Sequence, residues 1–512
     1  MKYFITIVLL LCRLFALAQT AVYPNNGTLY DGAMHKVELL MSADSVTALF
    51  DPANSWTNHS YPATFVYDNA DTVRNIGVRI KGNTSRNAQK QGIKLEIDEF
   101  VNQTYQGLKV FNLNGNHNDP SLTRELLSNY VMRKTGNICM RTNWVQLYIN
   151  GVYYGLRHQV ENIDKKFLMS RFGSSAGNLY KCSWPADLGW IDANANSYKN
   201  IINPSLLNER AYDLKTNTTA DDYADLVHLI SIVNNTPAAH FKDSIETIFD
   251  VQAYLKVLAG EVLIGHWDDY FYNKNNYFLY HNPATQKFVY LPYDMDNTFG
   301  IQWGVPNINV RDIHHWGNTN NTAAKLTSRI LLIAQYNADY EQYMRDMIAT
   351  VYNENYLFPT LDSLQNLAAP AIATDPFYTG AVPSDYGYTV QNWANSYTQA
   401  IDSHVSFGIK PFISDRKNSA INQFIFPPLS APQLAQQAVE LYPNPTNGFV
   451  DIRLRENALV EVWSAVGQKM QTQSLSWGNS RIDLSRLQAG CYWLFFRFEN
   501  GDIATQKVVR LP

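Results

Sequence analysis

Several oxygen-bearing side chains in the middle of the chain could meet around a divalent cation. Asp268, Asp269 and Asn276 come before a short apolar run, and Asp294 and Asp296 come shortly after the next one. Carboxylate and carboxamide oxygens are the ligands that Mg²⁺ or Mn²⁺ takes when it bridges nucleotide phosphates. Because gathered carboxylates repel one another without a cation, these residues predict a metal site if the fold brings them together.

Whether they meet depends on the two apolar runs. Residues 277–280 and 288–291 are short and apolar enough to form paired strands, joined by a loop at residues 281–286. Such a pair would bring the acids before the first strand close to those after the second. The alternative is that the same acids are ordinary turn residues, because Asp and Asn are common where strands end. Spacing alone leaves both interpretations open.

Phosphoryl transfer also needs a cation on the nucleotide phosphates, typically a strand lysine oriented by a glutamate. Residues 80–97 contain Lys90 and Lys94. Lys94 lies inside an apolar strand, where an unpaired ammonium group is costly, and Glu161, at the end of a later strand, is a candidate partner. For either lysine, a solvated strand face is the simpler interpretation.

The order of these features along the chain is informative. A strand lysine, a helix and a glutamate come first, followed by His266–Asp268, an asparagine, a strand pair and an acidic turn at Asp294–Gly300. The sequence contains no GxxxxGK[ST] phosphate-binding loop. This order resembles a protein kinase core, with His266–Asp268 in place of the catalytic loop and Asp294–Gly300 in place of the metal-binding turn.

Strands are expected to dominate the first part of the chain. Residues 63–67, 73–80 and 93–97 alternate or run apolar, with Asn, Gly and Asp between them. A hairpin is expected around Asn150 and Gly151, because a two-residue hairpin turn needs positive φ at both positions.

Helices are expected to dominate the second part, which makes the chain an α+β protein. An earlier helix is indicated by Asp119 as its cap and by Gly136 after its end. Another is expected from Asp250 to about Gly265, and residues 325–425 have a mostly helical pattern.

Length and composition suit a protein of several domains. The chain has 512 residues, of which 46% are hydrophobic. Its formal net charge of -4, without long runs of one sign, indicates neither nucleic acid nor an anionic membrane surface as a partner. The 32 Tyr and 11 Trp suit either a hydrophobic core or the binding of flat, polar ligands.

The first residues have the pattern of a secretory signal peptide. Lys2 is followed by an apolar stretch over residues 4–17, and small residues lead to a cleavage site after Ala18. A membrane anchor is the alternative, but Arg13 interrupts a run that is already short for a span. Residues 1–18 are therefore expected to be removed, and the mature chain is expected to lack a transmembrane segment.

The last part of the chain changes character. Short alternating segments separated by Pro and Gly predict a small β-sandwich over residues 439–512, joined by a linker at residues 427–438. The segment resembles the C-terminal sorting domain of type IX secretion. This resemblance implies the type IX machinery as a partner and a secreted or cell-surface location, reached through the periplasm. An adhesion-type sandwich is the alternative. The motifs that carry the resemblance are Glu440–Gly448, Gly467–Lys469, Ile482–Gly490 and Lys507–Arg510.

Three cysteines remain after removal of the signal peptide. Cys139 and Cys182 could pair in an oxidising compartment, or both could be buried free thiols. No CxxC or His-rich spacing indicates zinc.

The large domain, residues 19–426, resembles the CotH (spore coat protein H) kinase family, an atypical branch of the kinase-like fold. The resemblance implies a β-rich lobe over about residues 20–180 and an α-rich lobe over about residues 181–426. The segments that carry it are Gly82–Arg86, Leu122–Glu125, Asn150–Gly155, Val160–Glu161, Gly177–Lys181 and Asp268–Gly300.

The family resemblance implies a reaction and roles. It implies transfer of phosphate from ATP to Ser or Thr of a protein acceptor, with Mg²⁺ or Mn²⁺. Asp268 would receive the hydroxyl proton, and Asp294, Asp296 and Asn276 would hold the metal. Asn273 is an alternative to Asn276, because it has the usual kinase spacing from Asp268.

The lysine assignment remains open because the family's second Lys after the Gly-Asn-Thr-Ser run is Gln91 here. Lys90, Lys94 and Lys181 are therefore all candidates for nucleotide binding. A second hypothesis is a surface adhesion or scaffold protein that keeps the fold without turnover.

Overall fold

The computed structural model forms two compact units, one before residue 426 and one after it. The predicted signal peptide, residues 1–18, and the predicted linker, residues 427–438, lie outside the described residues. The structure describes residues 23–24, 26–205, 209–317, 324–425, 439–454, 456–464, 469–498 and 503–511.

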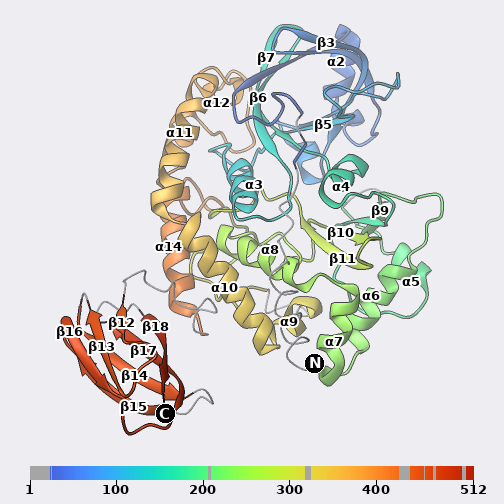
Figure 1. Ribbon diagram of the computed structural model, residues 1–512. Helices are drawn as coiled ribbons and strands as arrows, with labels where there is room; N and C mark the ends of the chain where they lie inside the picture. Colours follow the sequence, from blue (N-terminus) through green and yellow to red (C-terminus); the bar gives the residue numbers. More distant parts are fainter. Residues whose placement is uncertain are drawn as a thin grey trace. The chain divides into compact units, whose positions relative to one another are not determined.

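A closed barrel of seven strands forms one end of the first unit (Figure 1). The strand order is β1-β2-β3-β4-β5-β7-β6, and the parallel pairing of β1 with β6 closes the barrel. Alternate side chains point inwards and form a hydrophobic core of their own. The strands are β1 (His35–Leu40), β2 (Tyr61–Tyr67), β3 (Asp71–Lys81), β4 (Gly92–Glu96), β5 (Val110–Asn114), β6 (Thr142–Ile149) and β7 (Val152–Val160).

The predicted strands and hairpin of this region are confirmed. The three expected strands are β2, β3 and β4 of the barrel. Asn150 and Gly151 connect β6 to β7 with φ of 49° and 80°, as a two-residue turn between twisted strands requires. Helix α2 (Ala43–Phe50) and the short 3₁₀ helices η1 (Pro52–Asn54) and η2 (Thr84–Asn87) lie in the connections between barrel strands.

A four-stranded antiparallel sheet lies in the rest of this unit. Its order is β11-β10-β8-β9, and the predicted pairing of the two apolar runs is confirmed, with Phe278 opposite Leu291. Its strands are β8 (Leu179–Cys182), β9 (Tyr212–Leu214), β10 (Tyr277–Asn282) and β11 (Lys287–Pro292).

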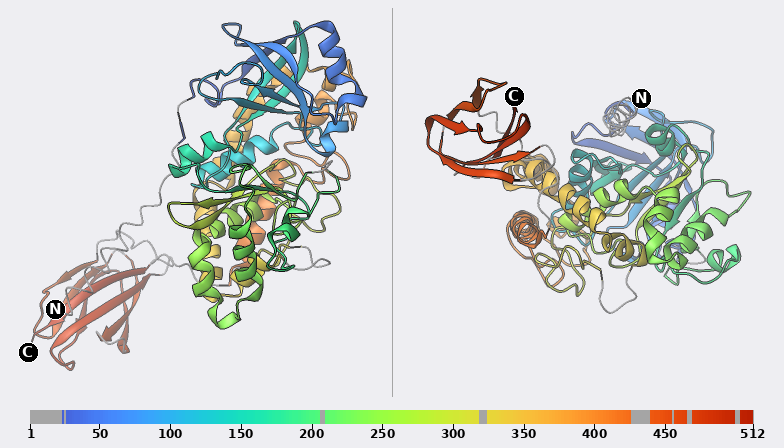
Figure 2. Two further views of the ribbon diagram at one scale, coloured as in Figure 1. Left: turned by 90° about the vertical axis from the view of Figure 1, so that its right-hand side faces the viewer. Right: turned by 60° about the horizontal axis from the view of Figure 1, so that its bottom comes forward.

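Helices surround this sheet and share a second hydrophobic core with it. Figure 2 shows the barrel at one end of the first unit and many of the helices at the other, whereas α11 and α12 lie beside the barrel and contact β7 (Figure 1). The α+β class is confirmed. The lobes do not divide cleanly at residue 180, because α3 and α4 already belong to the helical core. The helices are α3 (Arg124–Lys134), α4 (Lys165–Phe172), α5 (Ala195–Lys199), α6 (Ala224–Asn235), α7 (Ala238–Ile248), α8 (Val251–Ile264), α9 (Lys325–Leu331), α10 (Ala334–Thr350), α11 (Glu354–Ile372), α12 (Pro376–Thr379), α13 (Val390–Asn395) and α14 (Ile409–Gln423).

The predicted start of α3 is wrong by four residues. Asp119 is not the N-cap residue, which is Thr123. Its carboxylate accepts hydrogen bonds from the backbone of Ser121 and Thr123 in the turn before the helix and from the backbone of Arg124, the first helical residue, and it pairs with the Arg124 side chain at 2.6 Å. The predicted end is correct, since Gly136 has φ of 79° just beyond the helix.

The second unit consists of two antiparallel sheets, in the orders β12-β13-β16 and β15-β14-β17-β18. Their buried faces share one hydrophobic core, which is the arrangement of a β-sandwich. The strands are β12 (Glu440–Tyr442), β13 (Phe449–Leu454), β14 (Ala458–Ser464), β15 (Lys469–Leu475), β16 (Gly478–Asp483), β17 (Gly490–Phe498) and β18 (Ile503–Arg510).

Two further expectations concern cysteines and membranes. Cys139 and Cys182 are both buried and free, so the disulfide alternative does not apply.

Within the described ranges, no helix is long and apolar enough to cross a membrane.

Gly265 ends α8 and leads into the acidic segment, so its conformation should matter for stability. It has φ of 74°, and a Cβ there would lie 2.5 Å from the Phe412 ring. Gly173, which ends α4 with φ of 70°, has open space at the same position. We expect Gly173→Ala to cost about 1 kcal/mol from backbone strain, and Gly265→Ala to cost clearly more because a clash is added. Thermal melting of both variants tests this, and equal losses would contradict it.

Candidate functional site

The strand pair brings together three carboxylates, Asp268, Asp294 and Asp296, here called the acidic cluster. Asp268 lies four residues beyond the end of α8, and Asp294 lies two residues beyond β11. The backbone N–H of Tyr293 donates a hydrogen bond of 3.2 Å to the carbonyl of Asn276, which joins the two segments. The negative charge of Asp268 raises the pKa of both other carboxyls, which places all three in one electrostatic environment.

Asp268 is held by three carboxamides. Its carboxylate accepts hydrogen bonds from Nδ2 of Asn273 at 2.5 Å, Asn275 at 3.1 Å and Asn276 at 2.8 Å. Both sequence candidates for the metal-binding asparagine therefore contact Asp268. In the described part of the chain, neither Asn273 nor Asn276 has a hydrogen bond to its Oδ1, so either oxygen can still ligate a cation. Burial raises the pKa of Asp268 despite these contacts.

Asp294 and Asp296 lie in a place that is unfavourable for two negative charges. Burial first, and then the charges of Glu125 and Asp268, raise the pKa of Asp294 to about 6. Burial and the Asp294 charge raise the pKa of Asp296 well above its usual range. Among the described residues no hydrogen bond reaches the Asp294 carboxylate. A cation would relieve this repulsion.

The composition of the acidic cluster fits Mg²⁺ or Mn²⁺ bound together with a phosphate ligand. The described ranges contain no group of three or more His, Cys, Asp or Glu side chains that could hold a metal ion by themselves. Mg²⁺ commonly takes only one or two carboxylates and completes its shell with water and substrate phosphates. The oxygen donors of Asp294, Asp296 and Asn276 suit such an ion.

Asp269, the remaining acid of this segment, has a structural contact. Its carboxylate accepts a hydrogen bond of 2.7 Å from the backbone of Tyr272, which fixes the turn after Asp268. Burial, with a contribution from the charge of Glu261, raises the pKa of Asp269 to about 8. The nearby His266 is fully buried as well.

The lysine beside the acidic cluster is Lys81, which the sequence analysis did not single out. Its Nζ donates a hydrogen bond of 2.7 Å to Oδ1 of Asn114. Burial lowers the pKa of Lys81 to about 8, although the charges of Asp294 and Glu125 raise it. Lys81 ends an apolar strand directly before the Gly-Asn-Thr-Ser run, and that position was the available signal in the sequence.

Glu125, in the first turn of α3, has the position expected of a lysine-orienting glutamate. It accepts hydrogen bonds of 2.8 Å from both Asn114 and Asn116, and it lies 3.2 Å from His158. Asn114 thus bridges Lys81 and Glu125. Burial raises the pKa of Glu125, but the hydrogen bonds outweigh burial and hold that pKa below its usual value.

The two lysines predicted from the Gly82–Arg86 region have other partners. Lys90 is buried and pairs at 3.2 Å with Asp375, which is itself fully buried. Lys94 pairs at 2.7 Å with Glu96 on its own strand. The structure therefore engages both ammonium groups elsewhere, and neither contacts the acidic cluster.

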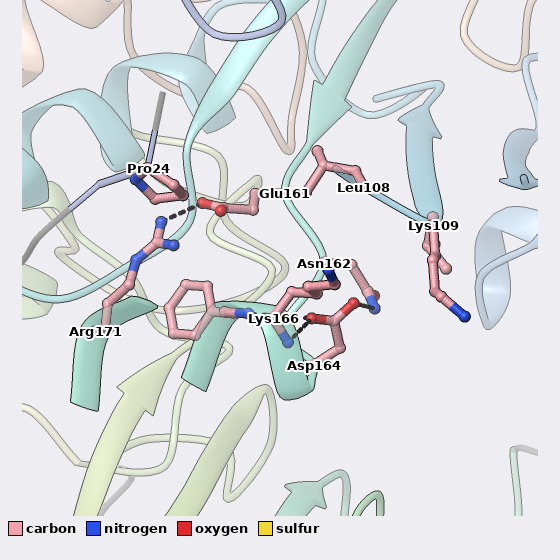
Figure 3. Close-up of a pocket in the computed structure, with 10 residues that line it drawn as sticks. Pro24, Leu108, Lys109, Glu161, Asn162, Asp164, Lys166 and Arg171 are labelled. Atoms are coloured by element: carbon pink, nitrogen blue, oxygen red, sulfur yellow. Dashed lines mark hydrogen bonds and ion pairs between the residues drawn. The ribbon is translucent and has the colours of Figure 1, made fainter. Parts of the chain in front are cut away.

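Glu161 also differs from the sequence expectation, because it pairs with arginines and not with a strand lysine. Its carboxylate lies 2.6 Å from both Arg141 and Arg171. Figure 3 shows Arg171 directed at Glu161 in a pocket separate from the acidic cluster. The residues that line this pocket are Pro24, Leu108, Lys109, Val110, Glu161, Asn162, Asp164, Lys166, Phe167 and Arg171.

Lys181 is the predicted lysine that does lie near the acidic cluster. It is on β8, its Nζ is 5.6 Å from the centre of the Tyr293 ring, and the Asp294 charge raises its pKa against the larger effect of burial. No hydrogen bond or ion pair of its ammonium group is found in the described part of the chain. Among the residues that the structure describes, Lys81 and Lys181 are therefore the two lysines whose charge acts on Asp294.

These electrostatics predict opposite effects of two matched substitutions. Asp294 has a higher pKa in the folded chain, about 6, than its ordinary value of 3.8, so its charge destabilises the metal-free fold above that pH. Asp294→Asn should raise the melting temperature at about pH 7.5, and this gain should vanish near pH 4. Asp375→Asn should lower the melting temperature, by an amount that corresponds to a loss of about 3–5 kcal/mol in the free energy of unfolding, because Lys90 then stays buried and unpaired. Thermal melting measures both, and destabilisation by Asp294→Asn would contradict the first.

Comparison with known proteins identifies both parts of the chain. Residues 78–416, well over half of it, match the family model of the CotH kinase protein. Residues 440–510 match the secretion system C-terminal sorting domain. This domain directs proteins to the type IX secretion machinery, and the chain is a secreted or cell-surface protein.

Several curated proteins are similar to the chain. Inner spore coat protein H of Bacillus subtilis is 24% identical over 307 residues, which cover 59% of this chain and 79% of that protein. Invasin CotH2 of Rhizopus delemar is 23% identical over 404 residues, covering 74% of this chain and 65% of that protein. Invasin CotH3 of the same fungus is 22% identical over 339 residues, covering 63% and 55%. The chain thus spans less than two thirds of either invasin. On the strength of the family match, the chain belongs to the CotH kinase protein family.

Proposed function

We propose that this chain is an exported atypical protein kinase on a two-lobed kinase-like fold, which transfers the γ-phosphoryl group of ATP to Ser or Thr of an acceptor protein. The observation that supports this most strongly is that Lys81 and Asp268, which are far apart in the sequence, both act on the charge of Asp294. A half-buried cation beside repelling carboxylates suits a triphosphate with its metal, since each charge of the ligand then finds its opposite.

In this proposal the lysines bind phosphate and the acidic cluster binds metal. Lys81 and Lys181 would contact the phosphate oxygens, and Asn114 would keep Lys81 oriented toward Glu125. Asp294, Asp296 and Asn276 would hold Mg²⁺ or Mn²⁺. When bound, this ion would neutralise charge on the phosphates.

Asp268 would act on the acceptor hydroxyl. The hydroxyl oxygen forms a bond to the γ-phosphorus, the bond between that phosphorus and the β–γ bridging oxygen breaks, and ADP leaves. The hydroxyl proton passes to Asp268. The three asparagine carboxamides hold this carboxylate in place, and its raised pKa makes it a better proton acceptor than an ordinary carboxylate.

Loss of the acidic cluster should abolish phosphotransfer. The purified mature chain is incubated with γ-labelled ATP, Mg²⁺ or Mn²⁺ and a general protein acceptor. We expect Asp268→Ala and Asp294→Ala each to lower incorporation of label at least about 100-fold, by removing the proton acceptor or the metal ligand. Glu96→Ala, which removes a half-buried barrel carboxylate that pairs with Arg79 and Lys94, is the control and should retain activity. Absence of transfer by the unmodified chain would refute the proposal.

A second candidate function is an adhesion or scaffold role without catalysis. The names of the relatives favour it, since two are invasins and another is a spore coat protein. Such a protein need not bind nucleotide.

Nucleotide binding separates the two functions and tests the lysine assignment. Ligand at about 100 times its Kd stabilises the native state by about 2.7 kcal/mol, so ATP with Mg²⁺ should raise the melting temperature of a kinase. We expect Lys81→Ala to lose most of this shift, whereas Lys94→Ala, a matched half-buried lysine whose ammonium group is already paired with Glu96, should keep it. No shift in the unmodified chain would favour the adhesion role, and an equal loss in both variants would contradict the assignment of Lys81.

A further inference from the structure

Two barrel side chains, from β7 and β6, hold the turn that precedes α3. The carbonyl oxygen of Leu122, two residues before the helix, accepts hydrogen bonds from Nε2 of His158 at 2.6 Å and from the indole N–H of Trp144 at 2.8 Å. Leu122 has φ of 47°, a left-handed conformation that costs free energy for a residue with a side chain. The barrel therefore keeps this turn in a conformation that the local chain does not favour by itself.

The other ring nitrogen of His158 faces Glu125. A carbonyl oxygen can only accept, so Nε2 carries a hydrogen, and Nδ1 lies 3.2 Å from Oε2 of Glu125. Nδ2 of Asn116 lies 3.3 Å from the same Nδ1 and donates to the same Oε2 at 2.8 Å. Burial raises the pKa of Glu125, and the hydrogen bond and charge of His158 are the largest of the effects that lower it. His158 thus helps to keep Glu125 ionised.

Glu125 in turn fixes Lys81 through Asn114. Oε1 of Glu125 accepts a hydrogen bond of 2.8 Å from Nδ2 of Asn114, and Oδ1 of that carboxamide accepts one of 2.7 Å from Lys81. The carboxamide cannot turn over without placing a donor against the ammonium group and an acceptor against the carboxylate. A chain of contacts therefore runs from His158 to Lys81, and its first members, His158 and Glu125, are 0% and 1% exposed.

We propose that His158 is a positioning residue for the phosphate-binding lysine. It holds the Glu125 carboxylate at one end of this chain of contacts, and that carboxylate fixes the Lys81 ammonium group at the other. The inference rests on the role of Lys81 in the proposed function, and it assigns to the barrel the task of keeping Glu125 in place. The alternative is that His158 is a core residue that only stabilises the turn at Leu122.

Two substitutions at His158 separate these roles. Gln can place its amide nitrogen where Nε2 lies and keep the bond to Leu122, whereas Asn can place its amide nitrogen where Nδ1 lies and keep the bond to Glu125. For a positioning residue, His158→Gln disturbs Lys81 in a folded protein, and His158→Asn lowers the melting temperature but leaves Lys81 as it is. A core residue alone would give no such division.

The state of Lys81 can be measured without nucleotide. The mature chain is labelled with a limiting amount of acetic anhydride, and the rate of modification of each lysine is read by peptide mass spectrometry. We expect His158→Gln to speed the labelling of Lys81 about threefold or more, because loss of one hydrogen bond shifts an equilibrium by about that factor. His158→Asn should not speed it. His35→Gln, which alters another buried barrel histidine that contacts two carboxylates, is the matched control and should leave Lys81 unchanged.

Nucleotide kinetics give a second readout. His158→Gln should raise the KM for ATP about tenfold with little change in kcat, because it acts on a binding group and not on the proton acceptor Asp268. If the unmodified chain neither binds nor uses ATP, the proposed function fails, while the labelling of Lys81 still decides whether His158 positions it.

Two outcomes would overturn the inference. They are unchanged labelling of Lys81 in a folded His158→Gln variant, and equal effects of Gln and Asn at this position. If neither His158 variant folds, Glu125→Gln in a chain with ¹⁵N-labelled histidine takes their place. It must shift the Nδ1 signal of a histidine and also speed the labelling of Lys81, and anything less than both changes overturns the inference.

Discussion

Repulsion within the acidic cluster is the constraint on which the site depends. Asp268, Asp294 and Asp296 each have a raised pKa, chiefly because burial disfavours their charge. The backbone nevertheless holds these carboxylates together. Strands β10 and β11 pair along their whole length, and the side chains of both strands are almost entirely buried. Packing of this sheet must therefore outweigh the electrostatic cost. Because the three carboxylates repel one another, a bound cation would lower the free energy of the folded chain more than it would at a site without this repulsion.

Two lysines, the buried Lys90 and the half-buried Lys81, differ in whether an anionic partner already neutralises their charge. Burial lowers the pKa of both Lys81 and Lys90 to about 8. The Lys90 ammonium group is neutralised by the carboxylate of Asp375, which also accepts a hydrogen bond from the backbone of Leu156. Lys81 instead contacts the neutral carboxamide of Asn114. Its charge thus remains available to an anion, whereas that of Lys90 serves to join the barrel to the segment after α11.

Features with local causes were predictable. Asn150 and Gly151 form the expected turn because only a few residue types accept positive φ there, and the strand pair around residues 281–286 forms because each strand is apolar along its length. Asp119 was misplaced for a related reason. Its carboxylate can cap a turn as readily as a helix, and the sequence does not distinguish a turn that precedes the helix from the helix itself.

Composition, apolar runs and turn residues act over short distances, so they were enough to predict the two-part organisation, the α+β class and which carboxylates could meet. Which cation lies beside these carboxylates could be read only from the folded chain. Lys90 finds its partner 285 positions away in Asp375, Glu161 finds two arginines, and Lys81 is left next to Asp294. Ion pairing depends on positions in space, and closure of the barrel against the helical core sets those positions.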